Sequence, residues 1–155
     1  MAGGSPEHAR LQLTFAAELR SAIVRVGKPC NVYGADLRVR IVETDRSTHP
    51  DATVVYGPKQ LAGDDAQAVV NPTVIVEVLS ESTERDDRGE KFAHYRRLPS
   101  LQEYVLVSQD ARRIEVFRRS PEGWVLSEAG PSEEVELRAL GVRIPVDAVY
   151  FDPSA

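Results

Sequence analysis

Five aliphatic residues surround a single carboxylate, Glu77, in residues 74–79. A strand that is apolar on both faces is typical of the buried centre of a sheet, because helices that cover both sides remove the usual polar alternation. An ionised Glu in such a strand is costly to desolvate unless a cation or several hydrogen-bond donors meet it. The pattern therefore predicts a central strand and a partner for Glu77, either a basic side chain or a metal ion.

Residues 7–26 show the three- and four-residue spacing of an amphipathic helix. Ser5 and Pro6 suit its N-cap and first helical position, and Gly27 suits its end. Residues 1–6 are also expected to act as a loose leader. One stripe of the helix is apolar and is expected to pack against the core: Leu11, Phe15, Leu19, Ala22, Ile23 and Val26.

A second helix is expected after the central strand. It begins at Thr83, which matches a capping box with Asp86, and runs to about Leu98. Pro99 ends it, because the residue before a proline disfavours the helical conformation. Near the C-terminus, the tail from Pro145 is expected to form a short helical turn that packs one or more of three apolar residues: Val149, Tyr150 or Phe151.

The remaining segments alternate between apolar strands and polar turns. Residues 43–50 and 57–71 are expected to be loops. The order of helix, strands, helix and further strands predicts an α/β fold, with a mixed central β-sheet flanked by helices, in a single domain spanning residues 1–155. Extended segments are expected at 31–42 (with a turn at 33–36), 52–56, 103–107, 113–119 paired with 124–127, 135–137 and 142–144.

Composition limits the class of protein. With 42% hydrophobic and 28% charged residues, the chain is typical of a globular protein rather than a disordered or fibrous one. No apolar segment approaches the ~18 residues of a membrane span, and the N-terminus lacks the basic start and apolar core of a secretory signal. Cys30 is the single cysteine, which excludes an internal disulfide and fits a reducing, cytoplasmic location.

The formal net charge of −5 at pH 7 argues against a protein that coats nucleic acid by charge alone. The charge is unevenly distributed. Residues 84–119 carry nine Lys or Arg and seven Asp or Glu, a balance of +2, whereas residues 120–155 carry two and seven, a balance of −5. The middle of the chain can therefore face an anion, although acidic neighbours also favour ordinary solvated faces. Candidates for phosphate contacts are Arg38, Arg40, Arg85, Arg88, Arg96, Arg97, Arg112, Arg113, Arg118 and Arg119.

Three residues are candidates for catalysis. Asp51 stands at the head of one core strand, Glu77 inside the next, and Lys91 eight residues past the start of the second helix. Carboxylates from neighbouring strands can converge on Mg²⁺, which takes oxygen ligands and keeps several waters, and the Val78 carbonyl can add a third protein oxygen. The Lys91 ammonium can orient or deprotonate an attacking water, or stabilise a developing phosphate charge. The constellation predicts phosphodiester hydrolysis with Mg²⁺, or with Mn²⁺ in its place.

An ordered series of motifs contains these residues: Pro50-Asp51, Val76-Glu77-Val78-Leu79-Ser80 with Ser82-Thr83, Asp87-Arg88-Gly89-Glu90-Lys91 with Tyr95, and Glu103-Tyr104. The series, within residues 8–119, resembles the Uma-type putative restriction endonuclease family of the PD-(D/E)XK nuclease superfamily. The resemblance implies a restriction-endonuclease-like fold, a Mg²⁺-dependent phosphodiesterase site acting on DNA, and often a homodimer. By position it assigns Asp51 and Glu77 as the acidic residues and Lys91 as the lysine, displaced from the strand onto the helix.

Two departures from that pattern bear on activity. A strict (D/E)-X-K motif needs lysine at position 79, where this chain has Leu79. In this family a lysine on the following helix, here Lys91, is taken to substitute for the strand lysine. Family members also have a hairpin segment before the region that begins here near His8, and its loss is expected to affect structure or activity. The alternative function is therefore a catalytically inactive nuclease-fold module for binding or assembly.

Each candidate also has an ordinary structural explanation. Glu77 and Lys91 can form a buried ion pair without a metal, and Asp51 can cap a turn. Asp87 can hold Lys91 as an i,i+4 pair on an exposed helix. Tyr95 can pack on the sheet rather than touch a substrate. His8, His49 and His94 lack zinc-ligand spacing with one another and with Cys30. The resemblance places His8 near the site, where a polar role at the helix start competes, and His49 can either approach the metal or be an ordinary loop residue.

Overall fold

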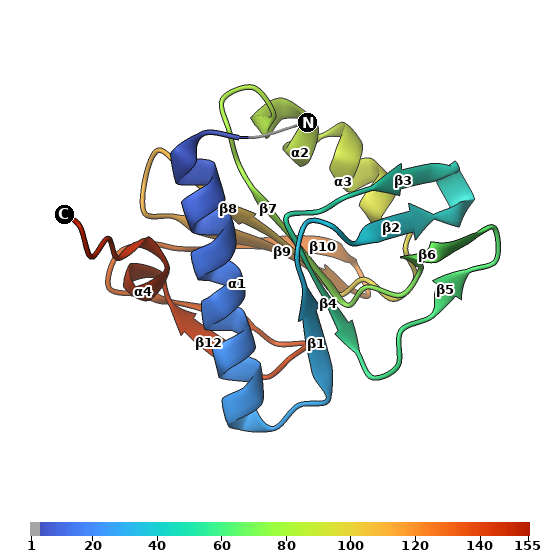
Figure 1. Cartoon of the computed structure of the whole chain (residues 1–155), viewed down its shortest axis with the longest axis horizontal. Coiled ribbons are helices and arrows are strands. Elements are labelled where there is room, and N and C mark those ends of the chain that lie inside the picture. The colour runs from blue at the N-terminus through green and yellow to red at the C-terminus, as the bar shows by residue number, and fades with distance from the viewer. Residues whose placement is uncertain (1–3) are drawn as a thin grey trace.

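A six-stranded mixed sheet forms the centre of the computed structural model, which describes residues 4–155 (Figure 1). The parallel pair is β7 with β8, and the other neighbours in this sheet are antiparallel. The expected α/β fold with a mixed central sheet is confirmed. The strands lie in the order β1 (Cys30–Tyr33), β4 (Ala52–Tyr56), β7 (Val74–Val78), β8 (Glu103–Val107), β9 (Ile114–Ser120) and β10 (Gly123–Ala129).

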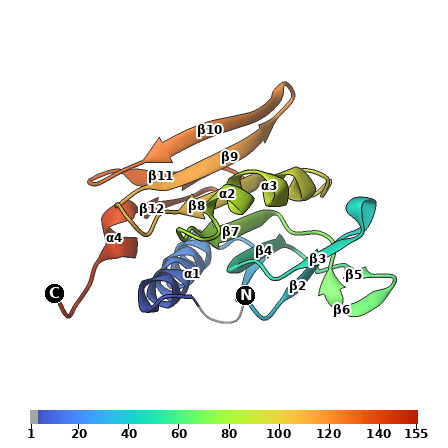
Figure 2. The same cartoon turned by 90° about the horizontal axis from the view of Figure 1, so that it is seen from above.

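Helices cover both faces of the sheet. Figure 2 shows α1 (Pro6–Val26) on one side of β7, and the short helices α2 (Glu84–Arg88) and α3 (Glu90–Tyr95) on the other. Each face has its own apolar core, one containing the buried stripe of α1 and the other containing α3. The helix α4 (Val146–Tyr150) packs in the α1 core, as does the two-stranded sheet of β11 (Glu134–Leu137) and β12 (Val142–Pro145).

β7 is the buried central strand that the sequence predicts. All five of its residues are buried. Val76 and Val78 pack in the α1 core, whereas Ile75 packs in the α3 core. Because side chains alternate along a strand, Glu77 points to the same face as Ile75. The carboxylate therefore faces α3, the helix that carries Lys91.

The first helix confirms the expected signals at both ends. The Ser5 hydroxyl accepts a hydrogen bond from the His8 amide at 3.0 Å, and Gly27 adopts the left-handed conformation with φ 75°. Ser5 and Pro6 are thus part of the helix start rather than of a loose leader, of which residues 1–3 lie outside the described residues. Val26 is exposed, so the buried stripe ends at Ile23. Within residues 4–155 no helix is long and apolar enough to cross a membrane.

The second helix differs from the expectation in its cap, its continuity and its end. It is broken at Gly89, where φ is −105° and ψ is −91°, and α3 ends at Tyr95 rather than near Leu98. Thr83 makes no capping hydrogen bond; its hydroxyl donates instead to the carboxylate of Asp87 at 3.0 Å. The capping-box prediction is wrong because this buried carboxylate takes the hydroxyl that a cap would have used.

Two segments expected to be loops contain strands of a smaller, four-stranded sheet. Residues 43–50 include β3, and residues 57–71 include the β5–β6 pair. These strands are short and largely exposed, so they lack the apolar alternation that marks a strand in sequence. β6 is held instead by parallel pairing with β2, which is remote in sequence. The order is β3 (Arg46–Thr48), β2 (Arg38–Ile41), β6 (Asp65–Val69) and β5 (Leu61–Ala62), with a 3-10 turn, η1, at Val42–Thr44.

Candidate active site

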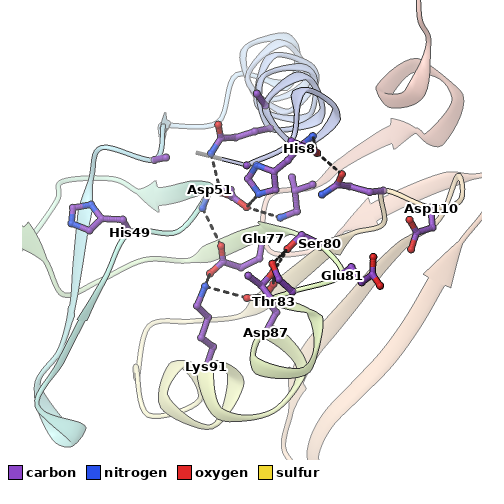
Figure 3. A pocket seen from close by; sticks show the side chains of 18 residues that line it. His8, His49, Asp51, Glu77, Ser80, Glu81, Thr83, Asp87, Lys91 and Asp110 are labelled. Carbon is purple, nitrogen blue, oxygen red and sulfur yellow. Dashed lines mark hydrogen bonds and ion pairs between the residues drawn. The ribbon is translucent and has the colours of Figure 1, made fainter. Parts of the chain in front are cut away.

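An open cavity of about 1080 Å³ lies at the carboxyl end of β7 (Figure 3). Asp51, Glu77 and Lys91 all line it. Asp51 directly precedes β4, and the antiparallel pairing of Ala52 with Val76 places Asp51 opposite Glu77. The register of two core strands therefore brings together the two carboxylates that the sequence singles out.

Asp51 is held by groups from α1 and β7. Its Oδ1 accepts a hydrogen bond from Gln12 Nε2 at 2.8 Å, and its Oδ2 accepts one from the Val78 amide at 2.7 Å. His8 Nε2 lies 3.3 Å from Oδ2. The N–H and C=O groups of one strand residue point toward the same neighbour, so the Val78 carbonyl also faces the Asp51 side. A turn cap does not describe Asp51, which links a helix to the central strand.

Glu77 is 3% exposed, and both of its carboxylate oxygens have partners. Oε1 accepts a hydrogen bond from the Asp51 amide at 3.2 Å, and Oε2 accepts bonds from Lys91 Nζ at 3.1 Å and from the Tyr95 hydroxyl at 2.9 Å. Burial raises the pKa of Glu77 to about 7, with Lys91 opposing the rise and the nearby carboxylates of Asp51 and Asp87 adding to it. The positive charge of Lys91 and the hydrogen bonds to Glu77 therefore do not fully offset the cost of burying its carboxylate.

Lys91 is shared between two carboxylates. Its Nζ lies 3.1 Å from Glu77 Oε2 and 3.1 Å from Asp87 Oδ1. Burial favours a lower pKa for Lys91, but the two carboxylates outweigh burial and raise the pKa above its ordinary value. The raised pKa of Glu77 and the raised pKa of Lys91 are compatible, because Lys91 divides its charge between Glu77 and Asp87 while burial and the Asp51 carboxylate also act on Glu77. The ammonium form of Lys91 is therefore the stable one.

Tyr95 packs on the sheet, which was the structural alternative to a contact with substrate, and it also contacts Glu77. Its ring meets that of Tyr104 with centroids 5.3 Å apart, and the residue is fully buried. The hydroxyl lies 2.9 Å from Glu77 Oε2 and 3.1 Å from the Thr48 hydroxyl. Because a carboxylate only accepts, Tyr95 donates to Glu77 and accepts from Thr48. Tyr95 thus orients the carboxylate from beneath the cavity.

The donor groups at the cavity suit a hard divalent cation. Two carboxylates and the Val78 carbonyl supply oxygen atoms of the kind that Mg²⁺ takes while it keeps several waters. No group of three or more His, Cys, Asp or Glu side chains within residues 4–155 is placed to hold a metal, so water would complete the coordination. The ionised carboxylates of Asp51, Glu77 and Asp87 and the ammonium of Lys91 together carry a formal charge of −2, which a divalent ion would neutralise.

Two residues at the cavity were not predicted from the sequence to be site residues. Gln12 holds Asp51, and Asp87 is a buried partner of Lys91 rather than a member of an exposed helical pair. A signal for Gln12 was its i,i+4 spacing from His8, which places both polar side chains on one face of α1 beside the buried stripe. Nothing in the local pattern indicates that Asp87 is buried, because its burial depends on tertiary packing, in which the Tyr104 hydroxyl of β8 contacts the Asp87 carbonyl.

The histidines and arginines named from the sequence lie at different distances from the cavity. His8 lies beside Asp51, and His49 lines the cavity (Figure 3). His94 does not line it and lies 3.9 Å from Glu90. Carboxylates pair with seven of the arginines proposed for phosphate contacts. The expected solvated faces are confirmed for Arg38, Arg97 and Arg112, whereas Arg88, Arg113 and Arg118 pair with the buried carboxylates of Glu115 and Glu103. The pairs are Arg38–Asp65, Arg40–Asp64, Arg88–Glu115, Arg97–Glu43, Arg112–Asp147, Arg113–Glu115 and Arg118–Glu103.

Known proteins share this chain's sequence and architecture. Two uncharacterized proteins of Synechocystis sp. (strain ATCC 27184 / PCC 6803 / Kazusa) are similar in sequence. The first, slr1290, is 35% identical in an alignment 155 positions long, which covers 97% of this chain and 77% of that protein. The second, sll1609, is 32% identical over 139 residues, which cover 88% of this chain and 77% of that protein.

A solved structure and a family model match nearly the whole chain. The crystal structure of a putative nuclease belonging to DUF820 from Anabaena variabilis ATCC 29413 has a TM-score of 0.75 at 16% identity, covering 97% of this chain and 82% of that one. It shares the restriction-endonuclease-like fold. The model of the Uma2 family, described as putative restriction endonuclease, matches residues 1–147. This chain therefore belongs to the Uma2 family of putative restriction endonucleases.

Proposed function

We propose that this protein is a Mg²⁺-dependent endonuclease that hydrolyses DNA phosphodiester bonds at the Asp51–Glu77–Lys91 site. The family description and the nuclease named as a structural relative support the reaction class. The observation that carries the proposal is the convergence of two carboxylates at the end of paired core strands, with a lysine 3.1 Å from one of them.

Each residue has a distinct role in the proposed reaction. Asp51, Glu77 and the Val78 carbonyl would hold the cation, which polarises the phosphodiester and lowers the pKa of a bound water. Gln12 and Tyr95 orient the two carboxylates through hydrogen bonds of 2.8 Å and 2.9 Å.

Lys91 acts as a cation rather than as a base. Its neighbouring carboxylates raise its pKa, so that it carries a proton at neutral pH and does not deprotonate water. Of the roles considered for it, a fixed ammonium fits two: orienting the attacking water and stabilising the charge that develops on the phosphate. This assignment predicts that loss of the positive charge, rather than loss of a proton acceptor, explains the effect of replacing Lys91.

Cleavage of plasmid DNA with Mg²⁺ or Mn²⁺ tests the proposal. Asp51→Asn, Glu77→Gln and Lys91→Met should each lower cleavage, and the two carboxylate variants should fall to background. Asp110→Asn is a matched control, since Asp110 is an exposed carboxylate that lines the same cavity. Cleavage by the wild type that survives both carboxylate substitutions would overturn the assignment of the site.

One observation favours a second candidate, a nuclease-fold module that binds or assembles without turnover. Glu81 and Asp110 are exposed at the cavity rim, and many arginines are already paired with carboxylates. Such a surface has few free positive charges to offer a polyanion. No cleavage with either metal, together with a normal folded state, supports this alternative.

Assembly as a homodimer is part of the proposal. β10 is an outer strand of the main sheet, and its Val125 and Leu126 side chains are exposed. An exposed edge with apolar side chains can pair with a second copy of itself. Light scattering after gel filtration should then give twice the mass of the chain, and Val125→Lys should reduce it to one chain.

A further inference from the structure

Asp87 is a buried carboxylate that has no role in the two-carboxylate reaction. It lies in α2 and is 2% exposed. Its Oδ1 lies 3.1 Å from Lys91 Nζ, and beyond that ion pair Oδ1 has no hydrogen-bond partner in residues 4–155. A buried carboxylate is costly unless its partners compensate for lost hydration. One of its two oxygens is therefore committed to the proposed catalytic lysine.

The position of Asp87 does not depend on Glu77. Its Oδ2 accepts a hydrogen bond from the Thr83 hydroxyl at 3.0 Å, and its amide donates to the Thr83 carbonyl at 2.8 Å. The hydroxyl of Tyr104, a buried residue of β8, donates to the Asp87 carbonyl at 2.8 Å. Side chain and backbone are thus both fixed by groups outside the metal-binding oxygens, so Asp87 stays in place when the charge at Glu77 changes.

Lys91 has two partners that respond differently to a cation. Its Nζ is 3.1 Å from an oxygen of Glu77 and 3.1 Å from an oxygen of Asp87 (Figure 3). A divalent ion bound to Glu77 would attract that carboxylate and repel the ammonium. Asp87 is then the carboxylate partner that remains for Lys91 among those it contacts in residues 4–155. Without Asp87, a flexible and partly exposed lysine side chain would turn to water.

We propose that Asp87 is a positioning residue that keeps Lys91 at the cavity while a divalent cation occupies Asp51 and Glu77. This inference rests on the proposed function of the same site. It assigns the i,i+4 relation across the break at Gly89 to the reaction rather than to helix stability. Asp87 itself touches neither the cation nor the substrate; it acts through the ammonium that it holds.

The test compares Asp87→Asn with Asp86→Asn. Asn retains the shape of the side chain, and Asp86 is an exposed carboxylate on the same short helix, so the control removes an equal charge from the same element. The first readout is the rate of reductive methylation of each lysine at saturating Mn²⁺. The chain has three lysines, of which Lys28 and Lys59 are exposed and serve as internal references.

In the wild type and in Asp86→Asn, Lys91 should react more slowly than Lys59, because its ammonium stays paired with Asp87. In Asp87→Asn the two rates should become equal. The second readout is single-turnover cleavage of DNA. Asp87→Asn should lower the rate by about 10- to 100-fold while the Mn²⁺ dissociation constant stays within about threefold.

Each outcome separates this inference from the proposed function. Protection of Lys91 that persists in Mn²⁺-loaded Asp87→Asn overturns the inference alone, as does cleavage at the wild-type rate. A wild type that binds no Mn²⁺ overturns the proposed function and the inference together. If Asp87→Asn does not fold, Thr83→Val takes its place, because it keeps every charge but removes the hydroxyl that fixes Asp87. Lys91 should then be methylated faster than in the wild type. A Lys91 that stays protected in Thr83→Val counts against the inference.

Discussion

The Asp51 carboxylate accepts a hydrogen bond from the Val78 amide at 2.7 Å, across the end of the β4–β7 pair. This bond replaces the next rung of the strand ladder with a side-chain contact. As a result, the Asp51 side chain, the Val78 carbonyl and the Glu77 side chain all converge on one point at the edge of the sheet. The cavity is thus part of the sheet rather than an addition to its surface.

Gln12→Ala should weaken divalent-metal binding without unfolding the protein. The amide of Gln12 holds Asp51 Oδ1 at 2.8 Å, and loss of such an outer-shell partner typically lowers metal affinity about 10- to 100-fold. Isothermal titration with Mn²⁺ measures the effect. Gln67→Ala, at an exposed position, is the matched control and should bind as the wild type does. Equal affinities for the two variants would show that Asp51 needs no support from α1.

The stability of the metal-free protein should fall as pH rises from about 4.5 to about 7, the ordinary and folded-state pKa values of Glu77. A carboxyl whose pKa is higher in the folded state binds its proton more tightly there, so its contribution is fully present below pH 4.5 and is lost as pH rises through about 7. Burial raises the pKa of Asp87 in the same direction. The loss attributable to Glu77 is about 3 kcal/mol.

Urea unfolding in a chelator, at steps of pH, checks this dependence. Glu77→Gln removes the titrating group and should flatten the profile, whereas Glu122→Gln, at an exposed turn, should leave it unchanged. Saturating Mn²⁺ should restore the stability of the wild type at neutral pH, because an ion that binds only the folded state stabilises it by mass action. Parallel profiles for the wild type and Glu77→Gln would contradict the assigned burial cost.

Gly89→Ala should destabilise the protein by about 1 kcal/mol relative to a control glycine. A Cβ at this position would lie 3.1 Å from the Arg85 carbonyl, so the break between α2 and α3 must shift to admit it. Gly63→Ala is the control, since a Cβ there meets no atom within 4 Å. Because the break lies between Asp87 on α2 and Lys91 on α3, a shift there should move the two side chains relative to each other, and cleavage should fall in the Gly89 variant. A normal cleavage rate would separate the break from the site.

The central strand and its lysine could be predicted from the sequence because they depend on local patterns. A carboxylate in an apolar run demands a partner, and the helix that follows supplies Lys91. Gln12 and Asp87 could not be identified in this way. Their roles depend on how α1 packs against the sheet and on how α2 packs against β8, which are properties of the tertiary structure. The small sheet was missed for a related reason, since β2 and β6 pair across a long interval.

Anomalous diffraction from a crystal soaked in Mn²⁺ tests the central claim most directly. The account predicts one peak between the carboxylates of Asp51 and Glu77, within coordination distance of the Val78 carbonyl oxygen, with Lys91 displaced from Glu77 but still beside Asp87. An undisturbed Lys91–Glu77 ion pair with no peak between the two carboxylates, at a Mn²⁺ concentration that supports cleavage, would contradict it.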